Sequence, residues 1–215
     1  MFYHPYPTDT IQYGGKMPWN KLYVKPLASK TLYKPTWNVT RCSVRDVGKF
    51  ADLVGGRRVT TLAGWSIGRM GPLYFIRDYP ERRRNISYIL LFDPGSYHEL
   101  LGDCDRSNLS TVLANWLGAP GSNNRLAILA GKASYDAANP SIVNGRRYYH
   151  RGIQDVYFRA IRGNAALSSR VAVCNYNSMS HEDVFINFQF MMNQPRIGTT
   201  CPRAPDGSKP TPWRP

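Results

Sequence analysis

The sequence predicts an α/β fold, in which a mostly parallel sheet is flanked by helices within one compact domain. Two observations predict it. Apolar segments of strand length alternate with segments of helical periodicity between residues 43 and 192. The segment 86–92 is also apolar almost throughout, which is typical of a parallel strand that is covered on both faces. Residues 1–198 are assigned to this domain, and residues 199–215, which include five prolines, to an extended C-terminal tail.

Residues 1–42 form an irregular N-terminal segment, with short strand signals at 10–13, 21–25 and 36–39. The first helix is predicted to begin at Ser43, a hydroxyl N-cap, and to end at Gly55-Gly56. A strand over 58–63 and a sharp turn over 64–68 follow. The remaining predicted elements, in order, are helix 69–78, strand 86–92, helix 109–117, strand 126–130, helix 153–161, strand 171–174 and helix 182–191. In such sheets the ligand site lies at the carboxyl ends of the strands.

The composition is strongly basic, with 28 Lys and Arg against 14 Asp and Glu and a net charge of +14. This surplus favours contact with polyanions such as an anionic membrane or an acidic polymer. The short clusters 57–58, 82–84 and 146–147 are scattered, however, and scattered clusters are more typical of solvated surface. No specific nucleic-acid motif accompanies them. No stretch reaches the roughly 20 apolar residues of a membrane span, and residues 1–5 do not resemble a secretion signal.

The four cysteines, Cys42, Cys104, Cys174 and Cys201, are widely spaced and contain no Cys-x-x-Cys pair. This spacing argues against a zinc site or a redox dithiol, and no metal or organic cofactor is implied. An even count fits two disulfides in any of three connectivities and favours a secreted protein. Four buried free thiols, as in a cytoplasmic protein, are the alternative.

The segment Gly64-Trp65-Ser66-Ile67-Gly68 carries the strongest chemical signal in the chain. Acyl transfer by a serine requires a hydroxyl held clear of the sheet, and a tight strand-to-helix turn provides this. Glycines two residues on either side of Ser66 remove Cβ atoms that would collide with neighbouring backbone. The backbone N–H of Ile67, at the start of the following helix, could donate to an oxyanion. The pattern alone is weak, and its position between an apolar strand and a helix gives it weight.

A serine nucleophile needs a histidine as general base and a carboxylate that orients it. Of four histidines, His181 follows the last apolar strand, in a loop before a helix, where a base could reach the serine. Two carboxylates follow strand ends, Asp93 after 86–92 and Asp136 in the loop after 126–130. Each is also compatible with an ordinary turn or loop role, as Asp93-Pro94-Gly95 is common turn chemistry.

The segment 62–68 resembles the nucleophile elbow of the α/β-hydrolase superfamily, whose members often carry Gly-Trp-Ser-x-Gly. The resemblance covers roughly residues 43–192, and the order Ser66, Asp136, His181 is similar to the family order of nucleophile, acid and base. It implies a small serine esterase or lipase-like hydrolase with Asp136 as the acid. Asp93 is the alternative acid, since some lipases place it one strand earlier.

The chain departs from the family pattern at two points. Arg69 stands where the family usually has a second small residue after the elbow glycine, so that it either crowds the helix–sheet contact or offers charge to an acidic substrate. The usual oxyanion loop is not evident, and Tyr13-Gly14-Gly15 is its nearest analogue.

Three hypotheses of function follow from these patterns. The leading one is a hydrolase that cleaves an ester or thioester of a small molecule or lipid. The second is a non-catalytic basic protein on the same fold that binds a polyanion or an anionic membrane. The third is an effector that attacks phospholipid and is drawn to anionic membranes by its basic surface.

Overall fold

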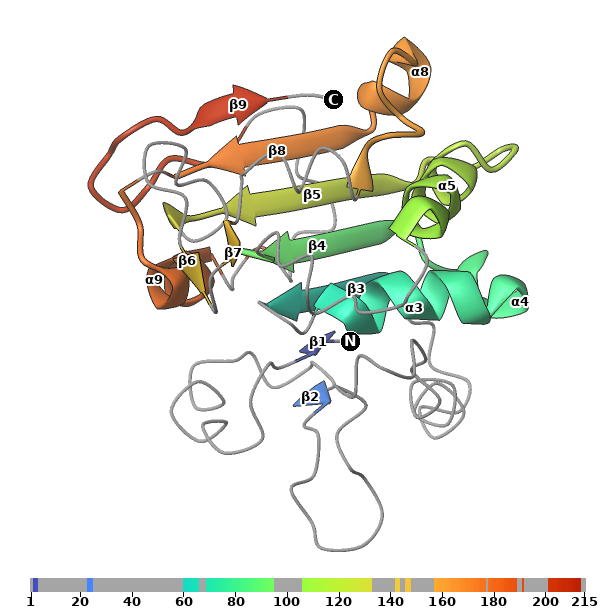
Figure 1. Ribbon diagram of the computed structural model, residues 1–215, viewed down its shortest axis with the longest axis horizontal. Helices are drawn as coiled ribbons and strands as arrows, with labels where there is room; N and C mark the ends of the chain where they lie inside the picture. The colour runs from blue at the N-terminus through green and yellow to red at the C-terminus, as the bar shows by residue number, and fades with distance from the viewer. Residues whose placement is uncertain are drawn as a thin grey trace, which may run out of the picture.

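The computed structural model describes residues 2–3, 23–24, 60–65, 69–94, 106–132, 142–143, 146–147, 157–176, 178–188, 191 and 201–213. Within them, seven strands form one sheet with the order β2-β1-β3-β4-β5-β8-β9 (Figure 1). The strands of this sheet are β1 Phe2–Tyr3, β2 Tyr23–Val24, β3 Thr61–Trp65, β4 Tyr88–Phe92, β5 Arg125–Ala130, β8 Val171–Asn175 and β9 Thr211–Trp213. Every pairing is parallel except that of β8 with β9.

Among the described residues, helices lie in the connections between the parallel strands β3, β4, β5 and β8. The helices of the described residues are α3 Met70–Asp78, α4 Pro80–Arg83, α5 Arg106–Leu117, α8 Ala165–Ser168 and α9 His181–Phe188. A separate antiparallel pair, β6 Ile142–Val143 and β7 Arg146–Arg147, lies in the connection between β5 and β8. The α/β class and the mostly parallel sheet predicted from the sequence are therefore confirmed. None of the helices among these residues is long and apolar enough to cross a membrane.

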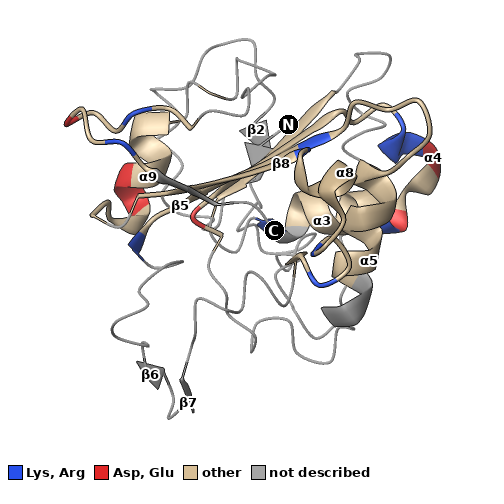
Figure 2. Cartoon of the chain, turned by 90° about the horizontal axis from the view of Figure 1, so that it is seen from above, with Lys and Arg blue, Asp and Glu red and all other residues tan. Residues whose placement is uncertain are grey.

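Two hydrophobic clusters cover the two faces of the sheet, because successive strand side chains point to opposite faces. On one face Leu62, Ile89 and Ile128 pack with residues of α3 and α5. On the other face Trp65, Phe92 and Leu129 pack with residues of α9 and with Ala204 of the C-terminal segment. Figure 2 shows α9 on the opposite side of the strands from α3, α5 and α8. The carboxyl ends of β3, β4, β5 and β8 consequently lie side by side, with α9 beside them.

Several predicted boundaries differ from those observed by one to three residues, and two differences have a visible physical cause. The strand predicted over 58–63 extends to Trp65, because Gly64 and Trp65 pair in register with Leu91 and Phe92 of β4. The helix predicted over 153–161 is not continued beyond Tyr157, since the residues that follow form turns in which the Phe158 carbonyl accepts from Ile161 and Arg162.

The C-terminal segment is part of the sheet, whereas the sequence predicted an extended tail for it. Cys201 forms a disulfide with Cys174 of β8, and Thr211–Trp213 pairs antiparallel with β8 as strand β9. Tertiary pairing of this kind leaves almost no signal in a three-residue strand that contains a proline. Of the early strands, Tyr23–Val24 falls in the predicted segment 21–25, and the segments 10–13 and 36–39 lie outside the described residues.

Candidate functional site

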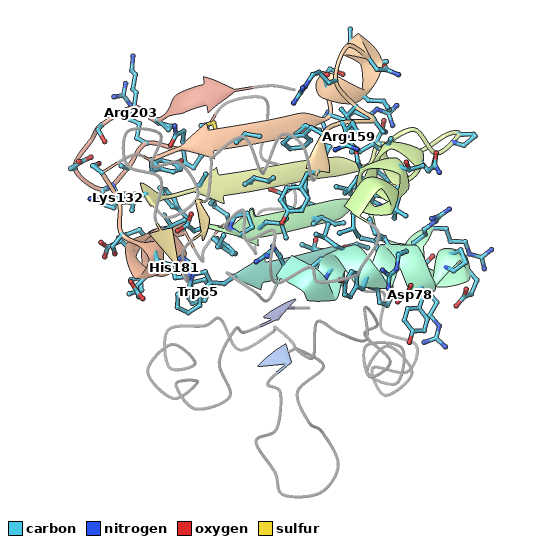
Figure 3. All side chains as sticks on the ribbon, viewed as in Figure 1. Trp65, Asp78, Lys132, Arg159, His181 and Arg203 are labelled. Carbon is cyan, nitrogen blue, oxygen red and sulfur yellow. A yellow bond between two sulfur atoms is a disulfide. The ribbon has the colours of Figure 1, made fainter. Side chains whose placement is uncertain are left out.

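The candidate site lies at the carboxyl edge of the central strands, which is where the topology places it. Asp93 directly follows β4, Gly131 directly follows β5, and His181 begins α9 after β8. Figure 3 shows Trp65 and His181 together at this end of the sheet, and Asp78 and Arg159 at the opposite end. Four segments that are distant in sequence therefore contribute to one edge.

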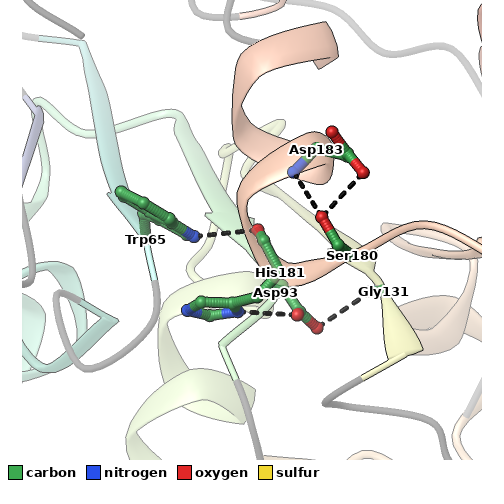
Figure 4. Close-up of polar contacts among 6 residues, drawn as sticks. All are labelled: Trp65, Asp93, Gly131, Ser180, His181 and Asp183. Carbon is green, nitrogen blue, oxygen red and sulfur yellow. Dashed lines mark hydrogen bonds and ion pairs between the residues drawn. The ribbon is translucent and has the colours of Figure 1, made fainter. Parts of the chain in front are cut away.

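Asp93 is a fully buried carboxylate with two hydrogen-bond partners (Figure 4). Its Oδ1 accepts from the backbone N–H of Gly131 at 2.9 Å, and its Oδ2 lies 2.7 Å from Nδ1 of His181. Its own backbone N–H donates to the Leu129 carbonyl at 2.6 Å, and its φ of 37° lies in the left-handed region that aspartate tolerates better than most residues. A buried carboxylate is retained only where such partners compensate its desolvation.

His181 is the first residue of α9, and its side chain is 22% exposed. The helix therefore begins at the histidine itself, one residue earlier than predicted. Ser180 caps it, because its hydroxyl accepts from the Asp183 N–H at 3.2 Å and donates to the Asp183 carboxylate at 2.7 Å. With Nδ1 bonded to Asp93, the second ring nitrogen, Nε2, points away from the buried carboxylate (Figure 4). Nδ1 is thus held by Asp93, and Nε2 is the ring nitrogen through which the candidate base could transfer a proton.

Trp65 joins the end of β3 to the first turn of α9. Its indole Nε1–H donates to the His181 carbonyl at 3.2 Å, and its ring centroid lies 5.3 Å from that of the imidazole. The indole also stacks on Phe185, with an interplanar angle of 10° and a centroid distance of 4.9 Å. The next residue in the chain is Ser66, so the strand that leads to the predicted nucleophile contacts the helix that carries the predicted base.

Arg69 is buried, with 1% of its surface exposed, at the amino end of α3. Burial raises the pKa of the Tyr157 phenol, and the charge and hydrogen bonding of Arg69 oppose part of that rise. Arg69 also acts electrostatically on Tyr74, whose pKa burial likewise raises. Both tyrosines belong to the cluster that packs α3 and α5 on the sheet. The Arg69 side chain is therefore accommodated among the buried tyrosines of this face.

The structure brings together only part of the predicted site. His181 and Asp93 are in contact, and it is the alternative acid that bonds the histidine. The preferred acid Asp136, the nucleophile Ser66, Ile67 and the oxyanion candidates Tyr13, Gly14 and Gly15 lie outside the described residues. Among the residues that are described, no three His, Cys, Asp or Glu side chains come close enough to hold a metal ion.

Two residues of the site were missed in the sequence. Gly131 directly follows an apolar strand, and a glycine at that position is a signal for close approach of another group. The sequence places Trp65 in the turn predicted over 64–68, and nothing in its local pattern indicates a contact with a residue 116 positions later.

We predict that the fold requires glycine at position 131, because a side chain there would collide with its neighbours. A Cβ there would lie 2.7 Å from Val184 Cγ2, 3.1 Å from the Met179 carbonyl oxygen and 3.2 Å from Asp93 Oδ2. We expect Gly131→Ala to lower the free energy of unfolding by about 1–3 kcal/mol through overpacking, measured by urea denaturation. Adding Val184→Ala removes the nearest atom, so the double variant should be less destabilised than the sum of the two single variants. Simple additivity would contradict this explanation.

Comparison of the chain with protein-family models, curated proteins and solved structures yielded no match, so the interpretation of the site depends on its geometry.

Proposed function

We propose that this chain is a serine hydrolase of the α/β-hydrolase type that cleaves an ester or thioester bond. The observation that carries the proposal is the hydrogen bond between the buried Asp93 carboxylate and Nδ1 of His181. A carboxylate and a histidine hydrogen-bonded in this way are two of the three members of a nucleophile–base–acid triad. Their place at the carboxyl edge of a parallel sheet is where such a fold binds its ligands.

The sequence supplies the third member at a matching position. Trp65 and Phe92 are register partners on β3 and β4, and Ser66 and Asp93 are the residues that follow each of them in the chain. The indole of Trp65 also contacts the imidazole that Asp93 holds. Ser66, the candidate nucleophile, thus directly follows Trp65, which contacts the candidate base His181. We assign Ser66 as nucleophile, His181 as base and Asp93 as acid.

The reaction then follows from the roles of these groups. The Ser66 hydroxyl attacks the carbonyl carbon while His181 Nε2 takes its proton, and Asp93 stabilises the imidazolium through Nδ1. The tetrahedral intermediate expels the alcohol or thiol, which receives the proton from His181. A water molecule then attacks the acyl-enzyme as His181 takes its proton, and His181 returns that proton to Ser66 Oγ as the carboxylic acid leaves. The backbone N–H of Ile67 is the candidate donor to the oxyanion.

The disulfide between Cys174 and Cys201 favours an oxidising compartment for this hydrolase, because such bonds persist mainly in secreted proteins. Secretion therefore remains part of the proposal, together with an ester-containing small molecule or lipid as substrate.

A fluorophosphonate probe tests the proposal directly, because it reacts covalently with an activated serine. We expect one probe per chain on the wild-type protein, attached to the peptide that contains Ser66, and no labelling of Ser66→Ala. Ser180→Ala provides a matched control, since it also removes a hydroxyl next to the site but leaves the proposed nucleophile. Folded wild-type protein, checked by circular dichroism, that takes up no probe would overturn the proposal and favour a binding role.

A further inference from the structure

The indole of Trp65 contacts His181 in two ways and α9 in a third. It donates from Nε1 to the His181 carbonyl at 3.2 Å, its ring lies against the imidazole at 5.3 Å, and it stacks on Phe185 one turn further along α9. Trp65 is itself only 2% exposed and is the last residue of β3. We infer that Trp65 is a positioning residue that sets the place of the His181 base relative to Ser66. This inference rests on the proposed function.

The packing around Trp65 explains how it could fix the helix. Phe185 lies between Trp65, on which it stacks, and Phe92, which meets it edge to face with a centroid distance of 5.4 Å. Trp65 and Phe92 are register partners at the carboxyl ends of adjacent paired strands, so both rings are anchored to the sheet. The first turn of α9 is therefore held against two strands by aromatic contacts of defined geometry.

The hydrogen bond from Trp65 Nε1 constrains the backbone of His181, which the stacking on Phe185 does not. The contacts of Phe185 define how α9 packs on the sheet, and the bond from Nε1 defines where the backbone of His181 itself lies. Asp93 fixes the ring of His181 from the side of β4, and Trp65 fixes its backbone from the side of β3. Since Ser66 follows Trp65 directly, one residue links the strand of the nucleophile to the backbone of the base. Displacing a catalytic group by about 1 Å costs on the order of 100-fold in rate.

The chain provides a matched control for this role. Trp116 of α5 is 1% exposed, and its Nε1 also donates to a backbone carbonyl, that of Ile86, at 3.0 Å. It belongs to the cluster on the opposite face of the sheet from Trp65 and α9. Trp65→Phe and Trp116→Phe therefore remove the same indole N–H and a similar buried volume, one beside His181 and the other away from it.

The experiment compares the hydrolysis of an activated ester, such as a p-nitrophenyl ester, by the wild-type protein and the two variants. We expect Trp65→Phe to lower kcat by about 10- to 100-fold with little change in KM, and Trp116→Phe to change kcat by less than about 3-fold, as expected of a site remote from the chemistry. Equal losses in the two variants, or a wild-type kcat in Trp65→Phe, would overturn the inference. If Trp65→Phe does not fold, 3-benzothienylalanine incorporated at position 65 keeps the bicyclic ring and replaces only the N–H by sulfur.

A second measurement separates this inference from the proposed function. The proton on Nδ1 of His181, bonded to Asp93, gives an imidazole NMR signal whether or not the protein is an enzyme. We expect 3-benzothienylalanine at position 65, which keeps a bicyclic aromatic ring beside the imidazole and removes only the N–H, to shift or broaden this signal, and Trp116→Phe to leave it unchanged. A wild-type protein without turnover or labelling would overturn the proposed function alone. An imidazole signal that is unchanged by 3-benzothienylalanine at position 65 would overturn the positioning role alone.

Discussion

Asp93→Asn is expected to lower kcat/KM for an activated ester by about 10,000-fold while leaving the protein folded. In the proposed mechanism the carboxylate accepts a hydrogen bond from Nδ1–H of His181, so that the unprotonated Nε2 can take a proton from the serine. An asparagine in the same place would present its amide N–H₂ to Nδ1, because its oxygen is retained by the N–H of Gly131. The imidazole would then accept at Nδ1 and carry its proton on Nε2, which is the wrong tautomer for a base.

The choice of asparagine keeps the structural contributions of this residue nearly constant. Asparagine has almost the same volume as aspartate and tolerates the left-handed φ of 37° that an alanine would find strained. Urea denaturation of the variant should confirm that it is folded under the assay conditions. Asp136→Asn is the decisive comparison, since Asp136 is the other acid that the sequence proposes. We expect it to keep wild-type activity within about 3-fold, because Asp93 already occupies the acid position beside Nδ1 of His181. Loss of activity in Asp136→Asn, with Asp93→Asn active, would transfer the acid role to Asp136.

The sequence could predict the central sheet because its strands are buried on both faces. Runs such as Tyr88–Phe92 and Arg125–Ala130 are apolar almost throughout, and the helical segments between them have a different periodicity. The exact ends were less predictable. Glycine at position 64 indicated a turn, but pairing with Leu91 keeps it in the strand. Local propensity was overridden there by the neighbouring strand.

The acid of the site shows where sequence reasoning reaches its limit. Asp93 and Asp136 both follow predicted strands, and the local pattern around each is compatible with an ordinary turn. What distinguishes Asp93 is a contact with a histidine 88 residues later, together with a glycine N–H from the next strand end. Such contacts depend on how strands are ordered and where α9 returns to the sheet. Neither is encoded in a short segment of sequence.

The disulfide between Cys174 and Cys201 is expected to be the strongest single stabilising link of the C-terminal segment. It closes a loop with a sequence separation of 27, with Cα atoms 5.5 Å apart. Cys174 is fully buried on the α9 face, and Cys201 packs against the same cluster. We expect replacement of both cysteines by alanine to lower the free energy of unfolding by roughly 3.5 kcal/mol, from the restored freedom of a loop of this length in the unfolded chain.

Urea denaturation followed by circular dichroism would measure the change. Replacing the two cysteines is preferable to adding a reductant, because the substitution removes this disulfide alone. Tyr176→Phe provides a control in the same segment, since it removes only the hydrogen bond from the Tyr176 hydroxyl to the Pro202 carbonyl at 2.7 Å. That loss should cost about 1 kcal/mol. A midpoint unchanged by removal of the disulfide would contradict the prediction.

The same double variant separates stability from catalysis in this fold. The disulfide fixes the C-terminal segment to β8, whereas the Asp93–His181 pair is held by Gly131, which directly follows β5, and by Trp65, the last residue of β3. Below the unfolding transition of the variant, its kcat/KM should therefore stay within about 3-fold of wild type, because Gly131 and Trp65, which hydrogen-bond the pair, are unchanged. A large loss of turnover in the folded variant would mean that the C-terminal segment also determines the position of α9, with which it shares one hydrophobic cluster.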